Sequence, residues 1–210
     1  MMAEDFHKPT QYSGDKFDTY EGGADPAQIL RVAHDTAHAL LTRARETDDP
    51  EVIDRLVAYT DANGIDALAE LWARSSPRSL PGALWRIYLL RLVIRQDAAG
   101  TSHLFQRGTE ALPTIDAVVA GARVPTGPDE ITELADQILR GLFRGDLAVA
   151  LDRAASFSRI LAAGCTSVAD DSELTNPERA TELTTRAARL AQTAAEFTAC
   201  ARLHSSGNLE

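Results

Sequence analysis

The stretch 80-LPGALWRIYLLRLVIRQD-97 decides the fold class. Its apolar side chains cover a helical wheel nearly all round, which is typical of a helix that is buried inside a protein. Two arginines interrupt the most apolar part, and that part is too short to span a lipid bilayer. We therefore predict that residues 82–97 form a central, buried helix of a protein without membrane spans.

Helix start and stop signals recur on both sides of this stretch. Asp25, Asp49 and Asn176 each precede a proline, and proline fits the first position of a helix because its missing N–H has no intrahelical partner there. Gly64 and Gly164 follow apolar segments and are predicted to end helices. No segment alternates apolar and polar residues as a strand does. The predicted helices span residues 26–46, 50–62, 65–75, 82–97, 109–121, 129–143, 146–163 and 177–204, with an irregular turn over 98–108.

The sequence thus predicts an all-α single domain of about eight helices in packed antiparallel pairs, with a long C-terminal helix. Residues 1–24 are polar and contain glycine, so we expect a flexible N-terminal arm before the helical domain at 25–204. The loop 121–128 is the best candidate for a boundary within that domain. Residues 205–210 form a predicted tail.

The charge and the cysteine content of the chain narrow the classes of function that it can have. The 210 residues carry a formal net charge of −10, which repels phosphate backbones and argues against a nucleic-acid partner. The two cysteines do not suggest a disulfide framework, and the acidic N-terminus does not resemble a signal peptide. We therefore predict a cytoplasmic protein.

The histidines in 34-HDTAH-38 are the first candidate site. The spacing differs by one carboxylate from the H-E-x-x-H signature of zinc proteases, and it places His34 and His38 side by side on a helix, as two ligands of zinc or another divalent metal would be. The alternative is two histidines at the edge of an apolar stripe, with Asp35 paired to Arg31. Candidates for a third ligand, by residue type alone, are His103, Glu110, Asp116 and His204.

A second candidate site is one stripe of the helix at 82–97. Tyr88, Arg91 and Arg95 share this stripe, and two guanidinium groups beside a phenol are suited to hold a carboxylate or phosphate. The alternative is that the arginines pair with carboxylates of this acidic chain, because an unpaired buried charge is costly.

The last helix carries a seam in which large and small apolar residues alternate at spacings of four and three. A seam of this kind lets a second helix approach closely. It packs either on the chain's own helices at 129–143 and 146–163 or on a second copy in a homodimer. Its residues are Leu183, Ala187, Leu190, Ala194, Phe197 and Ala201.

The sequence contains no phosphate-binding loop, dinucleotide-binding motif or nucleophile elbow, and no catalytic residue or cofactor is assigned. Our first hypothesis for function is a non-enzymatic interaction or regulatory protein that binds a protein partner or a second copy. The first alternative is a domain that binds a small molecule or anion through Tyr88, Arg91 and Arg95. The second is a metal-dependent hydrolase that uses His34 and His38.

Overall fold

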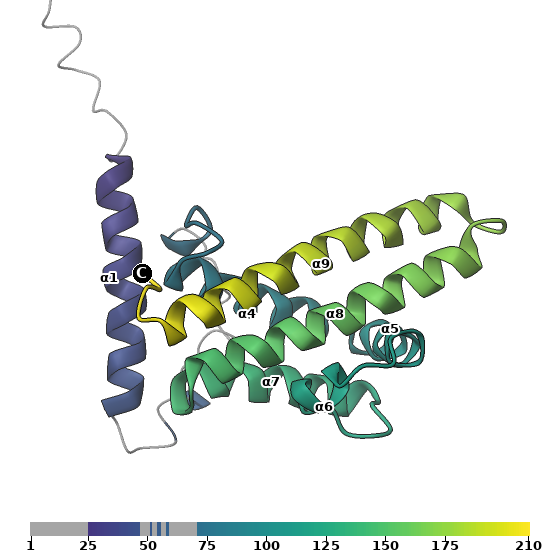
Figure 1. Ribbon diagram of the computed structural model, residues 1–210, viewed down its shortest axis with the longest axis horizontal. Helices are drawn as coiled ribbons and strands as arrows, with labels where there is room; N and C mark the ends of the chain where they lie inside the picture. The colour runs from purple at the N-terminus through teal and green to yellow at the C-terminus, as the bar shows by residue number, and fades with distance from the viewer. Residues whose placement is uncertain (1–24, 47–50, 52–53, 56–57, 59–70) are drawn as a thin grey trace, which may run out of the picture.

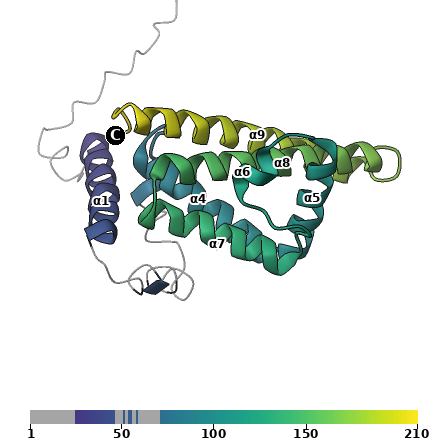
Figure 2. The ribbon, with the colours of Figure 1, turned by 60° about the horizontal axis from the view of Figure 1, so that its bottom comes forward.

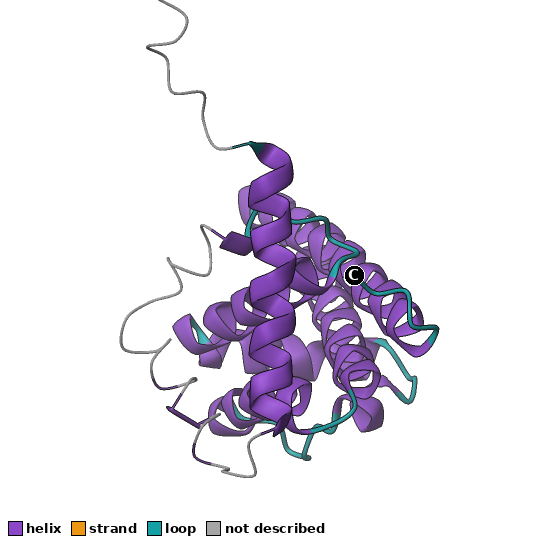
Figure 3. Ribbon diagram, turned by 90° about the vertical axis from the view of Figure 1, so that its left-hand side faces the viewer, coloured by secondary structure: helices purple, strands orange, loops and turns teal. Residues whose placement is uncertain are grey.

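The computed structural model describes residues 25–46, 51, 54–55, 58 and 71–210 (Figure 1). The predicted arm at 1–24, the helix at 50–62 and most of the helix at 65–75 lie outside these residues, apart from single positions. Within them every regular element is a helix and no strand occurs (Figure 3), which confirms the all-α prediction. The helices are α1 (Pro26–Glu46), α4 (Leu80–Gln96), α5 (Ala98–Ala111), α6 (Asp116–Ala120), α7 (Pro128–Arg144), α8 (Leu147–Ser172) and α9 (Pro177–Ser205).

Side-chain caps explain where the helices begin. The Asn176 side chain accepts a hydrogen bond from the Arg179 amide at 3.1 Å, and Pro177 takes the first helical position of α9 as predicted. Helix α4 begins at Leu80, two residues before the predicted start, because the Ser79 hydroxyl accepts a hydrogen bond from the Gly82 amide at 3.3 Å.

The prediction of one helix over 109–121 after an irregular turn is wrong. Helix α5 already begins at Ala98, where the Asp97 side chain accepts a hydrogen bond from the Gly100 amide at 2.8 Å. The helix ends just before Pro113, because proline lacks the N–H that would continue the ladder of hydrogen bonds. The chain then forms the short helix α6, which closes at Gly121 with the positive φ of 81° that glycine adopts readily.

The predicted helix end at Gly164 is also wrong, because α8 continues to Ser172. A Cβ atom at Gly164 would collide with the Leu104 carbonyl of α5, and one at Gly108 of α5 would collide with the Ile160 carbonyl of α8. The two glycines therefore allow the backbones of α5 and α8 to touch where the helices cross. Gly164 serves helix packing and does not end a helix.

Helices α8 and α9 form a long antiparallel hairpin that runs the length of the molecule (Figure 1), which confirms the predicted long C-terminal helix. Helices α5, α6 and α7 pack on α8, while α4 packs against α7, and α1 packs against α4 and α7. The Trp72 indole joins α1 to the body, since its Nε1 donates a hydrogen bond to the Thr36 hydroxyl at 3.1 Å.

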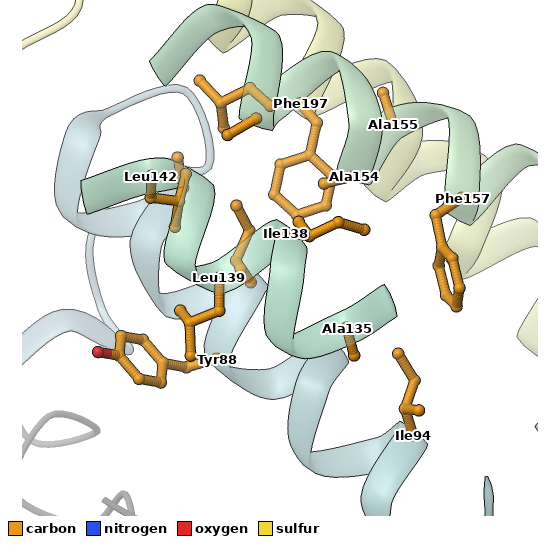
Figure 4. Close-up of a cluster of buried hydrophobic side chains, with 14 of the residues drawn as sticks. Tyr88, Ile94, Ala135, Ile138, Leu139, Leu142, Ala154, Ala155, Phe157 and Phe197 are labelled. Carbon is orange, nitrogen blue, oxygen red and sulfur yellow. The ribbon is translucent and has the colours of Figure 1, made fainter. Parts of the chain in front are cut away.

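The hydrophobic core lies where α4, α7, α8 and α9 meet (Figure 4). It joins residues on both sides of loop 121–128 in one cluster, since Tyr88 and Ile94 of α4 pack with Leu139 of α7 and Phe157 of α8. Helix α4 is less enclosed than its sequence suggests, because the exposed fraction is 37% at Leu92 and 44% at Val93. Among the described residues, no helix combines the length and apolar character needed to cross a membrane.

The crossing of α5 and α8 makes a testable prediction. The substitution Gly108→Ala should lower the free energy of unfolding by about 2–3 kcal/mol, because the added methyl meets backbone atoms that cannot move aside independently. Urea unfolding followed by circular dichroism measures this change.

Gly141→Ala in α7 is the matched control. A Cβ there would lie 3.5 Å from the Ala150 Cβ, an ordinary contact, so alanine should leave stability unchanged or raise it by up to about 1 kcal/mol. Equal effects at the two positions would contradict the backbone contact between α5 and α8.

Candidate functional site

The structure places the two histidines on α1, where His34 is half-buried and His38 is exposed. No ion pair joins Asp35 to Arg31, which the alternative interpretation of the histidines had paired. Among the described residues, no group of three or more histidine, cysteine, aspartate or glutamate side chains could hold a metal ion. The candidate third ligand Asp116 instead pairs with an arginine of α8.

The arginines of α4 pair with a carboxylate of α7. Arg91 Nε lies 2.6 Å from Asp136 Oδ1, and Arg95 Nη1 lies 3.6 Å from Asp136 Oδ2. The carboxylate of Asp136 thus neutralises part of the positive charge that would otherwise attract an anion. The ion pairs of Arg91 and Arg95 with Asp136 also join α4 to α7. The Tyr88 hydroxyl is buried and has no hydrogen-bond partner among the described residues. Burial raises the pKa of Tyr88 to about 12, and the charge of Arg91 opposes this shift.

The seam of α9 packs within the chain. All of its residues except Leu190 are buried, and α8 is the helix that covers most of α9. The first interpretation of the seam, packing on the chain's own helices, therefore describes this structure, with α8 as the main partner and not the predicted helix at 129–143. A surface for a partner has to be sought elsewhere.

The short helix α6 lies beside α8 (Figure 2). A side-chain network that the sequence does not reveal fixes it there. The Arg159 guanidinium donates from Nη2 and Nε to Asp116 Oδ1 at 2.6 and 2.9 Å. The Thr114 hydroxyl donates to the other carboxylate oxygen at 2.7 Å, and Ser156 accepts from Arg159 at 2.8 Å. The first turn of α6 is thus held by charge-assisted hydrogen bonds.

A second arginine holds the other end of α6. Arg153 Nε donates to the Ala120 carbonyl at 3.1 Å, so it satisfies a carbonyl that the end of the helix leaves free. The methyl group of Ala120 is fully buried below it. A five-residue helix does not persist alone in water, so α6 owes its shape to these contacts with α8.

The outer side of α6 is apolar. The exposed fraction is 74% at Ile115, 80% at Val118 and 91% at Val124, which follows in the loop. Val149 of α8, one turn before Arg153, is 56% exposed. Half of the ten large apolar side chains that are exposed in the described part of the chain belong to this group. We call it the α6 surface, and its residues are Ile115, Val118, Val119, Val124 and Val149.

The groups around α6 favour the ionised form of Asp116, which forms the anchor of α6 together with Arg159. Burial disfavours the ionised form of Asp116, but the hydrogen bonds from Arg159, Thr114 and Ser156 and the charge of Arg159 outweigh it, so the pKa of Asp116 is lowered.

The two cysteines have pKa values that are shifted in the opposite direction. Burial raises the pKa of Cys165, and it raises the pKa of Cys200 to about 11, so both remain thiols near neutral pH.

The chain matches no protein-family model, and neither a curated protein nor a solved structure is similar to it. The α6 surface therefore has to be interpreted from its own geometry. The sequence does not predict this surface, because the pattern of residues 109–121 is typical of one continuous helix. The available signals were Pro113 and Gly121, which bracket the short apolar segment.

The anchor predicts a pH-dependent contribution to stability. Asp116→Asn should lower the free energy of unfolding at pH 7 by about 2 kcal/mol, because the ionised carboxylate accepts hydrogen bonds from a guanidinium. The folded-state pKa of Asp116 is lowered, so this stabilisation is present above the ordinary aspartate pKa of about 3.9 and is lost as the pH falls through the folded-state value.

Urea unfolding of both proteins between neutral and acid pH measures the effect. Asp170→Asn is the control, because this exposed aspartate of α8 makes no ion pair with a described residue and its loss should change stability by less than about 0.5 kcal/mol. A stability difference for Asp116→Asn that persists at acid pH would contradict the role of the ionised carboxylate.

Proposed function

We propose that this chain is a non-enzymatic interaction protein of the cytoplasm that binds a protein partner through the α6 surface. The observation that carries the proposal is the exposure of Val118 on α6 and of Ile115 and Val124 on either side of it, since two arginines of α8 hold this helix in place. Exposed apolar side chains that are grouped on the surface of a folded protein often mark an interaction site, whereas single scattered ones are ordinary.

The α6 surface has physical properties that favour binding. Its residues are all β-branched, so their side chains have few rotamers and lose little entropy when a partner covers them. The anchoring of α6 by Arg153 and Arg159 means that the backbone is already ordered before a partner arrives. Pre-ordering of this kind lowers the entropic cost of association.

The cytoplasmic location is part of the same proposal. Cys165 and Cys200 are both free and buried, which suits a compartment that keeps thiols reduced. A formal net charge of −10 keeps such a protein soluble and favours association with partners whose surface charges are locally opposite to its own.

Site-specific photo-cross-linking in an extract of the native cells tests the proposal. A photoreactive residue at Val118 should yield one discrete adduct of higher mass after illumination. The same residue at Leu174, which is 97% exposed in the turn between α8 and α9, is the matched control and should yield none.

The adduct should disappear when Ile115→Ser is added to the chain that is labelled at Val118, because this change removes apolar area without touching the anchor. Circular dichroism verifies that the variant remains folded. An adduct that forms equally from both labelled positions, or from neither, would overturn an interaction at the α6 surface.

A further inference from the structure

Two carboxylates lie beside the loop that leads from α6 to α7. Gln106 of α5 donates a hydrogen bond from its side-chain amide to the Thr126 carbonyl of this loop at 2.7 Å. Glu110 follows Gln106 by one helical turn, so it lies on the side of α5 that is next to the same loop. Asp129 stands in the first turn of α7, where the loop ends. Both carboxylates therefore flank the part of the α6 surface that the loop carries at Val124.

A third carboxylate lies at the start of α8. Asp146 precedes Val149 of the α6 surface by three residues, a spacing that places two side chains on the same side of a helix. Its carboxylate accepts a hydrogen bond from the Ala148 amide at 2.8 Å and remains exposed. Glu110, Asp129 and Asp146 are all exposed and make no ion pair with a described residue. We call these three residues the acidic rim.

Described arginines that adjoin the α6 surface are engaged within the chain. Arg123, next to Val124, donates to both carboxylate oxygens of Glu133 at 3.0 and 3.3 Å. Arg153 donates to the end of α6, and Arg159 donates to the carboxylate at its start. Their positive charges therefore do little to offset the acidic rim.

Exposed arginines that make no ion pair with a described residue lie on other elements, such as Arg31 on α1 and Arg189 on α9. Arg202 of α9 shares a groove with Asp152 of α8, and these two opposite charges balance each other. The α6 surface is thus an apolar area with carboxylates at its edge.

We infer that the partner of the α6 surface is a basic amphipathic helix of another protein, whose lysine or arginine side chains meet the acidic rim. This inference rests on the proposed function. Ile115, Val118 and Val119 stand at positions i, i+3 and i+4 along α6 and its cap, which forms a helical stripe against which a second helix packs. The apolar contacts form the core of the interface and the charges form its edge.

The charge of the acidic rim favours a basic helix over other occupants. A second copy of this chain would bring its own acidic rim to the interface, together with a formal net charge of −10. Nucleic acid and anionic membranes would be repelled in the same way. A basic helix gains from the burial of apolar side chains and from opposite charges around them.

Fluorescence anisotropy of two labelled peptides mixed with the full chain tests the inference. One peptide is an amphipathic helix of about 18 residues made of leucine and lysine, and the other has glutamate in place of each lysine. The lysine peptide should bind, and its dissociation constant should rise by about tenfold between about 0.05 M and 0.5 M salt, because salt screens exposed charges. The glutamate peptide should not bind.

Neutralising the acidic rim should raise the dissociation constant of the lysine peptide by about tenfold, because three exposed charge pairs are lost. The variant combines Glu110→Gln, Asp129→Asn and Asp146→Asn, and asparagine still caps α8. A matched control removes the same charge near the turn between α8 and α9 and should bind within about twofold of the wild type. It combines Asp170→Asn, Glu173→Gln and Glu178→Gln.

Removing apolar area from the α6 surface should weaken the same peptide. Ile115→Ser combined with Val118→Ser should raise the dissociation constant by about tenfold, because apolar side chains at the interface core are lost. Leu174→Ser is the control, since this exposed leucine lies in the turn between α8 and α9 and should leave binding unchanged. Circular dichroism verifies that every variant remains folded.

Three results would overturn the inference: equal weakening by the rim variant and its control, binding that the two serine changes do not alter, or a preference for the glutamate peptide. A dimer of the free chain that Val118→Ser dissociates would assign the surface to a second copy and also overturn it. If the lysine peptide fails to bind while Val118 still forms a discrete cross-link in the extract, the basic helix is removed and the proposed function stands.

Discussion

Helix α8 packs against four other helices in the part of the chain that the structure describes, and this packing constrains its sequence along most of its length. Where α5 crosses it, the two backbones touch, so the crossing point on each helix is a glycine, Gly164 and Gly108. Where α9 runs beside it, the buried side chains of α9 include four alanines and the ring of Phe197. The fold depends on this close approach, because a larger side chain at the crossing would separate α5 from the hairpin.

The same helix determines what the molecule presents to its surroundings. Along one side of α8, Arg153 and Arg159 reach out to α6 and bind its carbonyl and its carboxylate. An isolated helix as short as α6 would be unfolded in water, and folding it without these partners would leave buried polar groups unsatisfied. The polar network thus stabilises α6 and also keeps its apolar side chains at the surface, where they are available to a partner.

Features that depend on neighbouring residues can be predicted from the sequence, whereas contacts between distant residues cannot. The caps at Asn176 and Ser79 act locally, so helix starts follow from a few neighbouring residues, and the all-α class follows from the pattern as a whole. From its neighbours alone, Gly164 has the pattern of a helix end. Its actual role is the close contact with α5, which lies more than fifty residues earlier in the chain, so the local sequence does not reveal it. The Arg159–Asp116 pair joins positions that are 43 residues apart, and no local rule connects them. The candidate site of this protein therefore depends on tertiary contacts that the sequence does not disclose.

The arginines of α8 make α6 a fixed surface and not a mobile loop. Hydrogen exchange of individual amides, measured by NMR, tests it most directly, because the Val119 amide bonds to the Ile115 carbonyl at 2.9 Å and the Gly121 amide bonds to the Val118 carbonyl at 3.0 Å. If the anchor holds, these amides exchange only with the wider opening of the hairpin, at free energies close to those of amides in α8. Exchange of these two amides at the rate of an unfolded peptide would show that α6 is not held against α8.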